Sequence, residues 1–139
     1  MERCVVKLDS KVANKKIERW QKIAEAAAKQ SKRNSICKIN NIINIKNICN
    51  VVQNYDILLV PYENEEKNTL KETLKTIENK ENLNIAIVIG PEGGFEEKEI
   101  ELLKQNNGKI ITLGKRILRT ETVAMAMASI IMYEFGELE

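Results

Sequence analysis

The sequence predicts an α/β fold in which helices flank a mainly parallel sheet. Short apolar runs alternate with longer segments whose apolar residues recur every three or four positions, an order typical of parallel α/β proteins. The three clearest apolar runs each end at glycine or proline, which often mark strand ends. At 139 residues the chain suits one domain with a sizeable core, so residues 1–139 are expected to form a single domain.

The first half of the chain is expected to contain two helices and one firmly predicted strand. Residues 13–31 have apolar side chains at helical spacing and several alanines, which have high helix propensity. Within them, Trp20 is expected to anchor a core or an interface rather than to stack on a nucleic-acid base. The apolar stretch 35–39 is compatible with a strand, and residues 45–52 fit two helical turns. Residues 56–61 are expected to form a buried strand, closed by a proline that cannot donate to a ladder.

The second half is expected to alternate helix and strand to its end. Spaced leucine and isoleucine residues predict helices over 66–79 and 96–106. The apolar runs 85–89 and 109–114 predict two more buried strands, each closed by glycine. Residues 120–136 predict a long last helix that a final glycine ends. Strand and helix in this order indicate parallel strands joined by helices.

Composition excludes several classes of protein and of chemistry. Apolar residues make up 43% and charged residues 30%, as in folded globular chains. No apolar run approaches the ~20 residues of a membrane helix and the N-terminus carries no apolar signal region, so a cytoplasmic location is expected. The chain has no histidine, which excludes Ser-His and Cys-His nucleophiles and histidine metal ligands. The three cysteines match neither a disulfide framework nor a zinc pattern, so no metal is expected.

The formal net charge of +2 is too small to indicate nucleic-acid binding, but the basic residues are clustered. One segment contains Lys15, Lys16, Arg19, Lys22, Lys29, Lys32 and Arg33. A tighter group beside a glycine contains Lys115, Arg116 and Arg119. The first group is expected to be a solvated helix face. For the second group, a binding role is the preferred interpretation.

The carboxyl ends of the three best strands have the features of a binding site. Glycine- or proline-containing stretches follow these strands, at 58–65, 87–95 and 111–122. Ligands of open α/β sheets bind outside the carboxyl ends of the strands, so three such loops at one edge predict a site there. The glycine motif alone is weak, because it matches neither a phosphate-binding P-loop nor a dinucleotide fingerprint.

The middle stretch suits a ligand that is recognised through main-chain groups. Its three glycines leave backbone N–H and C=O groups accessible, with no Cβ in the way. Leu113, Ile117 and Leu118 could hold a flat ring between them. Glu92 has two interpretations of similar weight. It either caps the helix that starts near residue 95, where the helix dipole favours a carboxylate, or it belongs to the site.

The segment "LRTETVAMAMA" predicts an anion-binding helix start. Arg119 precedes a helix N-terminus, whose free N–H groups favour anions, and its guanidinium could hold a phosphate or a carboxylate in a bidentate fork. The N-cap is expected to be Thr120 or Thr122. Glu121 is either a partner of the helix dipole or a polar group of the site. The small and flexible side chains of 124–128 indicate a core or subunit interface rather than a cofactor site.

Together these motifs resemble one protein family. The stretches "IGPEGGFEEKEIELL" and "ITLGKRILRTETVAMAMASII", with the N-terminal region from "ERCVVKLDSK" to "NSICKI", are similar to the 16S rRNA (uracil-N3)-methyltransferase family. That family belongs to the SPOUT, or trefoil-knot, superfamily. The resemblance extends in order and spacing over essentially the whole chain. It implies a homodimeric enzyme that binds S-adenosylmethionine in a deep C-terminal trefoil knot and methylates N3 of one uridine in the decoding region of 16S rRNA, in the small ribosomal subunit.

The resemblance also implies positions for the site. The implied cofactor-binding residues are Leu59, Val60, Gly90, Pro91, Glu92, Gly94, Leu113, Gly114, Ile117, Leu118 and Thr122. The implied RNA-binding residues are Lys115, Arg116 and Arg119, and the candidate catalytic residues are Arg119, Glu121 and Glu92. Members of the family begin with a PUA-like barrel, followed by a first strand and helix. This chain starts at what resembles the end of the second strand, so an N-terminally truncated methyltransferase domain is expected.

Methylation at uracil N3 needs help, because that nitrogen carries a proton and is a poor nucleophile until the proton leaves. A proton acceptor is therefore expected, together with a group that stabilises negative charge on the uracil oxygens. Without histidine, the acceptors are Glu92, Glu121 or water, and Arg119 is the best candidate for stabilising the uracilate or an adjacent phosphate. Two other interpretations are a dimeric fragment that binds cofactor or RNA without turnover, and an ATP-binding domain. The chain argues against the second, since it has neither a P-loop lysine nor an acidic magnesium site.

Overall fold

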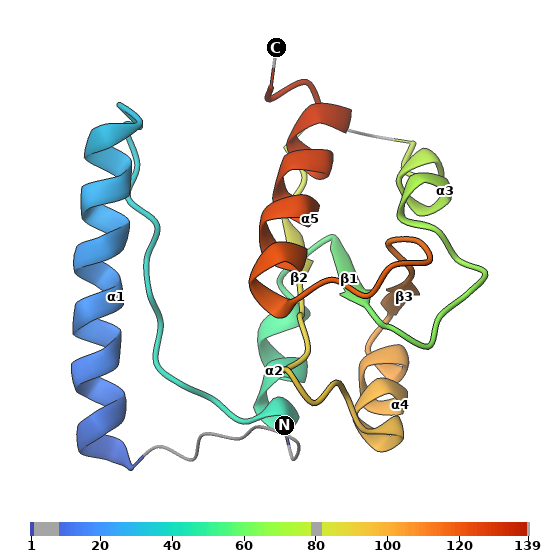
Figure 1. Ribbon diagram of the computed structural model, residues 1–139, viewed down its shortest axis with the longest axis horizontal. Coiled ribbons are helices and arrows are strands. Elements are labelled where there is room, and N and C mark those ends of the chain that lie inside the picture. The colour runs from blue at the N-terminus through green and yellow to red at the C-terminus, as the bar shows by residue number, and fades with distance from the viewer. Residues whose placement is uncertain (2–8, 79–81, 139) are drawn as a thin grey trace. The chain divides into compact units, whose positions relative to one another are not determined.

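The computed structural model describes residues 1, 9–78 and 82–138 of the chain (Figure 1). The described residues form secondary structure in the order α1-α2-β1-α3-β2-α4-β3-α5. Strands and helices thus alternate from β1 onward, as the sequence predicts. In this described part, no helix combines the length and hydrophobicity needed to cross a membrane.

The chain divides into two compact units. One is Val6–Ile43, and the other combines Met1–Val5 with Asn44–Glu139. The larger unit contains the sheet and the helices that pack on it. The single domain predicted over 1–139 stays a prediction.

The unit Val6–Ile43 is built on one long helix, α1 (Ser10–Gln30), which confirms the helix predicted over 13–31. Asp9 is its N-cap, and a side-chain oxygen of Asp9 accepts the backbone N–H of Val12 at 2.8 Å. This bond satisfies one of the N–H groups that have no partner inside the helix.

The strand considered for residues 35–39 is wrong, because these residues adopt no regular structure and pair with no strand in the described part of the chain. Their backbone groups bond to a helix side chain instead. Gln21 of α1 accepts the Ile39 N–H at 2.9 Å and donates to the Cys37 carbonyl at 3.3 Å. A short apolar run forms a strand only where a neighbouring strand can pair with its backbone, and the sequence pattern does not reveal that neighbour.

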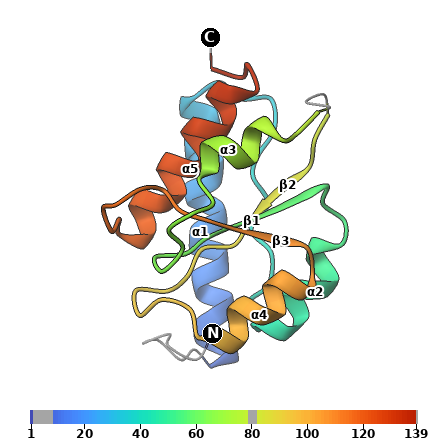
Figure 2. The same ribbon diagram turned by 90° about the vertical axis from the view of Figure 1, so that its right-hand side faces the viewer.

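A three-stranded parallel sheet lies at the centre of the larger unit (Figures 1 and 2). Its order is β2 (Ile85–Ile87), β1 (Ile57–Pro61) and β3 (Gly108–Ile111), so β1 pairs with both neighbours. Leu59 of β1 lies opposite the last residue of β2 and the second residue of β3. The predicted parallel α/β arrangement is confirmed.

Two helices pack on each face of this sheet (Figure 2). The helices α2 (Ile45–Val52) and α4 (Glu97–Gln105) contribute to one core, and α3 (Leu70–Lys75) and α5 (Thr120–Glu134) contribute to the other. The amphipathic spacing that predicted these helices therefore places their apolar sides on the sheet.

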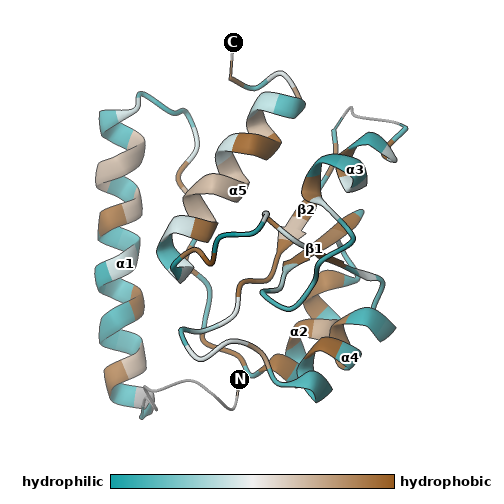
Figure 3. Ribbon diagram, turned by 45° about the vertical axis from the view of Figure 1, so that its right-hand side comes forward, coloured by the Kyte–Doolittle hydropathy of each residue, from teal (hydrophilic) through white to brown (hydrophobic). Residues whose placement is uncertain are grey.

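The strand β1 contributes to both cores because successive strand residues point to opposite faces. Leu58 and Val60 pack into the core of α2 and α4, whereas Ile57 and Leu59 pack into the core of α3 and α5. All four are buried, and burial of such a side chain contributes about 1.5–3 kcal/mol. Figure 3 shows the apolar strands between their helices. A continuous apolar run is typical of a strand that is covered on both sides.

Four further predicted elements are confirmed within one or two residues at each end. These are the helices over 45–52, 96–106 and 120–136 and the strand over 56–61. The helix predicted over 66–79 is shorter and corresponds to α3. Its start is fixed where the Thr69 hydroxyl oxygen accepts the Glu72 N–H at 3.2 Å. Position 79, the last residue of that prediction, lies outside the described residues.

The strands predicted over 85–89 and 109–114 also end early. After β2, the Val88 N–H still donates to a β1 carbonyl at 2.9 Å, and the chain then turns away from the sheet. After β3, the Thr112 N–H donates to the Asn68 carbonyl at 2.8 Å rather than to β1. The strand β3 is therefore shorter because its backbone then bonds to a neighbouring loop instead of to β1.

The N-cap of α5 was predicted at Thr120 or Thr122, and both predictions are wrong, by one and three residues. Its N-cap is Arg119, whose carbonyl accepts the Val123 N–H at 2.9 Å and whose side chain makes no capping bond. The predicted stop is confirmed, since Gly136 follows the helix with a φ of +76°. Glycine adopts this left-handed conformation without the cost that a Cβ brings.

Gly108, at the start of β3, is a position where any side chain would destabilise the fold. A Cβ there would lie 2.7 Å from the carbonyl oxygen of Leu103 in α4, so backbone would have to shift. Gly108→Ala is therefore expected to lower the free energy of unfolding by about 1–3 kcal/mol. Urea denaturation followed by circular dichroism measures this loss.

The control for this prediction is Gly136→Ala. The φ of Gly136 is unfavourable for alanine, but a Cβ there would meet nothing within 4 Å. The control should cost about 1–2 kcal/mol from backbone conformation alone and leave the packing intact. No measurable loss in Gly108→Ala would show that the end of α4 adapts without cost.

Candidate functional site

Three loops meet at the carboxyl edge of the sheet. We call them the β1 loop (residues 62–69), the β2 loop (residues 88–96) and the β3 loop (residues 112–119). Each follows the strand for which it is named, and parallel pairing places all three strand ends at one edge. Their convergence at one edge, predicted from glycine and proline at the strand ends, is confirmed.

The β1 loop and the β3 loop are joined through their backbones. Thr69 and Thr112 form an isolated parallel bridge. The Thr112 carbonyl accepts the Leu70 N–H at 3.2 Å, and the Tyr62 N–H donates to the Ile111 carbonyl at 3.0 Å. These bonds fix the two loops together at both ends of the β1 loop.

Inside the β1 loop, Glu65 holds the turn. Its carboxylate accepts the backbone N–H of Lys67 at 2.9 Å and that of Asn68 at 3.0 Å. The backbone N–H groups of Asn68 and Lys67 lower the pKa of the Glu65 carboxyl, because they bond to its charged form. The charged form that holds this turn therefore persists to lower pH than for an ordinary glutamate.

The β1 loop and the β2 loop meet through aromatic packing. The rings of Tyr62 and Phe95 lie edge to face, with centroids 6.4 Å apart and an interplanar angle of 67°. Phe95 is 1% exposed, so it fixes the end of the β2 loop in the core. At Gly94, which has a φ of +71°, the Glu63 carboxylate occupies the place where a Cβ would lie.

The β2 loop is also joined to the start of α5. The Thr120 hydroxyl donates to the Gly90 carbonyl at 3.4 Å. Within the loop, the Gly94 N–H donates to the Pro91 carbonyl at 2.8 Å and closes a turn. A Cβ on Gly90 would lie 3.0 Å from the ring of Phe95, so a side chain at this position would press on that ring.

The β3 loop provides open space beside apolar surface. Gly114 has a φ of +106°, and a Cβ there would meet nothing within 4 Å. The Gly114 N–H donates to the Thr112 hydroxyl oxygen at 3.2 Å, which shapes the turn. In the same loop, Leu113 and Leu118 are half-buried, and Ile117 is 86% exposed. Ile117 is therefore a large apolar side chain that the rest of the chain leaves uncovered in this loop.

The predicted cofactor-binding residues fall into three groups by burial. Leu59 and Val60 are fully buried in the two cores, so a ligand could reach only their backbone. Those half-buried at the edge are Gly90, Pro91, Gly94, Leu113, Leu118 and Thr122. Those exposed are Glu92, Gly114 and Ile117. Of these eleven positions, two lie in β1, four lie in the β2 loop and four lie in the β3 loop. The last, Thr122, lies in the first turn of α5.

The predicted charged residues are all exposed at the loops or at the start of α5. This group comprises Glu92, Lys115, Arg116, Arg119 and Glu121. Within the described part of the chain, the three basic members form no ion pair, which leaves their side chains available to a ligand. The interpretation of Glu92 as a helix cap is wrong. A capping box formed by Glu96 and Glu99 starts α4 instead.

Several residues that shape the edge were not singled out by the sequence. Thr120 was considered only as a cap, and Tyr62, Phe95 and Thr112 were not considered. Their shared signal is weak: each lies in or directly beside a loop that follows a strand. The pairs Thr120–Gly90 and Tyr62–Phe95 join positions far apart in the chain, and local patterns do not predict such pairs. Among the described residues, no three Cys, Asp or Glu side chains gather as a metal site would require.

A parallel sheet with helices on both faces and three loops at its carboxyl edge places the larger unit in the open α/β class, whose members bind ligands at that edge. Residues 1–132 match the family described as RNA methyltransferase domain, and the chain belongs to this family.

Two relatives illustrate the range of similarity. The chain is 40% identical over 134 residues to "Ribosomal RNA small subunit methyltransferase E" of Bacillus subtilis (strain 168), an alignment that covers 95% of this chain and 52% of the relative. It is 30% identical over 118 residues to the protein of the same name from Aquifex aeolicus (strain VF5), covering 85% of this chain and 48% of the relative. The chain thus spans about half the length of these curated relatives.

Solved structures agree with the fold. The chain matches a ribosomal RNA small subunit methyltransferase E from Neisseria gonorrhoeae, bound to S-adenosyl methionine, with a TM-score of 0.80 and 30% identity. It also matches the putative methyltransferase Lpg2936 of Legionella pneumophila, in complex with the bound cofactor SAM, with a TM-score of 0.84 and 29% identity. Each match covers 96% of this chain and 52% of the other.

Proposed function

We propose that this chain is the methyltransferase part of an enzyme that uses S-adenosylmethionine to methylate N3 of a uridine in the decoding region of 16S rRNA. The observation that carries the proposal is the bond between Thr120 and Gly90, which joins the "GPEGG" loop to the start of the "TETVAMAMA" helix. These two motifs are the ones on which the family resemblance rests. Membership of the RNA methyltransferase domain family supports the reaction class.

The residues of the edge fit S-adenosylmethionine. The half-buried Leu113 and Leu118, together with the exposed Ile117, offer apolar surface to an adenine ring. The open space at Gly114 and the side-chain-free backbone at Gly90 allow main-chain groups to bond with the cofactor. We propose that the β3 loop and α5 form the trefoil knot of the superfamily around this place. When bound, the cofactor supplies an electrophilic methyl group on a sulfonium.

The chemistry left to the protein is positioning and charge stabilisation. Arg119 is exposed at the N-cap of α5, where the free N–H groups of the helix also attract anions. We propose that Arg119 stabilises the negative charge that develops on the uracil oxygens, or that it binds an adjacent phosphate. Glu92, Glu121 or water accepts the N3 proton. Lys115 and Arg116 contact the RNA backbone.

A homodimer is part of the proposal. The apolar residues of α5 itself lie on all sides of the helix, and a helix that is apolar on all sides is normally covered on all sides. Val123, Met127 and Ile131 pack into the core, yet Met125 is 64% exposed and Tyr133 is 74% exposed. A second copy of this chain would cover that outer face. Because ribosomal RNA is the proposed substrate, we propose that the protein acts in the cytoplasm, on the small ribosomal subunit.

Calorimetric titration with S-adenosylhomocysteine tests the cofactor assignment. We expect one site per chain with roughly micromolar affinity, about −8 kcal/mol. In Gly90→Val the new side chain would press on the buried Phe95 ring and displace the β2 loop, so affinity should fall by at least tenfold. Gly136→Ala is the control and should bind as the wild type does.

Two results would contradict this assignment. One is the absence of binding to a wild-type chain that is folded by circular dichroism. The other is wild-type affinity in a folded Gly90→Val protein. Competition with ATP separates the cofactor from a generic nucleotide. Transfer of a labelled methyl group to small ribosomal subunits that lack the modification separates an enzyme from a fragment that only binds.

A further inference from the structure

Charge is segregated between the two units of the chain. The segment Val6–Ile43 contains ten lysine and arginine residues against three aspartate and glutamate residues, a net charge of +7. The rest of the chain has twelve against seventeen, a net charge of −5. The modest total of +2 therefore conceals a strongly basic unit, which sequence-wide charge does not reveal.

The basic residues of α1 lie along one side of the helix. At 100° per residue, five of them fall within an arc of about 80°: Lys11, Lys15, Arg19, Lys22 and Lys29. From the first to the last, the row extends about 27 Å at 1.5 Å per residue. All five are exposed. We call this row the basic face of α1.

The opposite side of α1 is apolar and more buried. Ile17 and Ala24 are half-buried, and Ala28 is 6% exposed. Trp20 lies about 140° from Lys15 around the helix, away from the basic face. It is 42% exposed, so the core anchor expected of it is wrong, and a role at an interface stays a prediction. The helix is thus amphipathic, and all five residues of its basic face are exposed.

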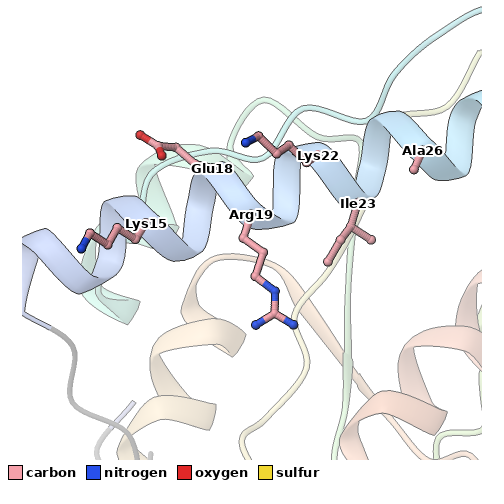
Figure 4. Close-up of a pocket in the computed structure, with 6 residues that line it drawn as sticks. All are labelled: Lys15, Glu18, Arg19, Lys22, Ile23 and Ala26. Atoms are coloured by element: carbon pink, nitrogen blue, oxygen red, sulfur yellow. The ribbon is translucent and has the colours of Figure 1, made fainter.

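Figure 4 shows the middle of the basic face, where a shallow hollow follows the helix. Its lining residues all come from α1: Lys15, Glu18, Arg19, Lys22, Ile23 and Ala26. The Arg19 side chain extends away from the helix, and Lys15 and Lys22 lie on either side of it along the same helix. Within the described part of the chain, none of these three forms an ion pair. Glu18, at the edge of the row, is the one acidic residue of the lining.

We propose that the basic face of α1 binds the phosphate backbone of RNA. This inference rests on the proposed function, and it adds a binding surface outside the loops that carry Lys115, Arg116 and Arg119. A straight row of exposed cations matches a chain of phosphates, and each contact releases counterions. The partner is RNA rather than an acidic protein, because protein interfaces are rich in aromatic side chains and methionine at their centre and this face has neither.

The test is a salt titration of binding to a fluorescein-labelled single-stranded RNA of twenty nucleotides. The variant replaces three residues together, Lys15→Gln, Arg19→Gln and Lys22→Gln. Because each phosphate contact with a single strand contributes about 0.7 to the slope of log K against log salt, the slope should fall by about 2. Affinity at 0.1 M salt should fall at least tenfold.

The matched control removes the same charge from the other unit, with Lys46→Gln, Lys71→Gln and Lys75→Gln, three exposed lysines of α2 and α3. Its slope should stay within 0.7 of the wild type. An equal loss in the control would show a general charge effect and overturn the proposal. So would an unchanged slope in the α1 variant, or weaker binding of that variant to polyglutamate with RNA binding intact.

Titration with S-adenosylhomocysteine on the same samples separates this inference from the proposed function. The α1 variant should bind it as the wild type does, because none of its three changes lies near the β2 or β3 loops in sequence. A wild-type chain that binds neither S-adenosylhomocysteine nor RNA contradicts both proposals. A wild-type chain that binds both, with a variant that loses neither, contradicts this inference alone.

Discussion

Replacing Arg119 by alanine is expected to lower the rate of methyl transfer by about 10²- to 10³-fold, or about 3–4 kcal/mol of transition-state stabilisation. Affinity for S-adenosylhomocysteine should change little. The difference is expected because the guanidinium would meet charge that develops on the uracil only as the N3 proton leaves. An interaction made only in the transition state lowers turnover without weakening the ground-state complex.

The position of Arg119 supports this expectation. It is the N-cap of α5, its side chain makes no capping bond, and it is exposed. Thr120, the next residue, donates to the Gly90 carbonyl at 3.4 Å and so fixes the helix start against the β2 loop. The backbone that carries Arg119 is therefore held beside the proposed cofactor site, while its guanidinium stays free to meet a substrate.

Single-turnover transfer of labelled methyl to small ribosomal subunits measures the rate, and calorimetry measures cofactor affinity. Arg116→Ala is the matched control, since it removes the same charge three residues away and should lower RNA affinity more than the rate. Arg119→Lys should recover only part of the loss, because an ammonium lacks the planar fork of a guanidinium. Parallel losses of rate and cofactor affinity in Arg119→Ala, or no loss of either, would overturn the role.

Features that depend on local sequence were predicted well. The run that forms β1 is apolar at every position, and only burial on both faces accommodates such a strand. The spacing of Ile17 and Ala24 predicts α1 because it depends on neighbours within two turns. The glycine and proline positions predict the loops, because these residues end strands wherever the rest of the chain lies.

Features that depend on distant partners were not predicted. The segment 35–39 resembles a strand by composition, yet Gln21 of the preceding helix takes its backbone bonds. Gly108 carries no visible motif, and it must be glycine because a Cβ there would lie 2.7 Å from the carbonyl oxygen of Leu103. Local patterns give the elements and the edge where a site forms. The contacts that shape the site are between loops.

Charging the outer face of α5 is expected to separate the proposed dimer. Met125 is 64% exposed in the single chain and Tyr133 is 74% exposed, so this face carries large side chains that a partner would cover. In a two-fold symmetric dimer the same patch meets itself, so Met125→Glu would bury two carboxylates in one interface. An unpaired buried charge costs about 3–5 kcal/mol, so the dimer should weaken by at least 100-fold.

Sedimentation equilibrium of wild type and variant measures this change, and circular dichroism should show unchanged helix content because Met125 lies outside the core. Val51→Glu is the control. It places the same charge at an exposed apolar residue of α2, 43% exposed, and should leave the dimer intact. A wild-type dimer that Met125→Glu leaves unchanged would move the interface away from this face. A monomeric wild type would instead leave the apolar outer side of α5 uncovered in solution and contradict the homodimer itself.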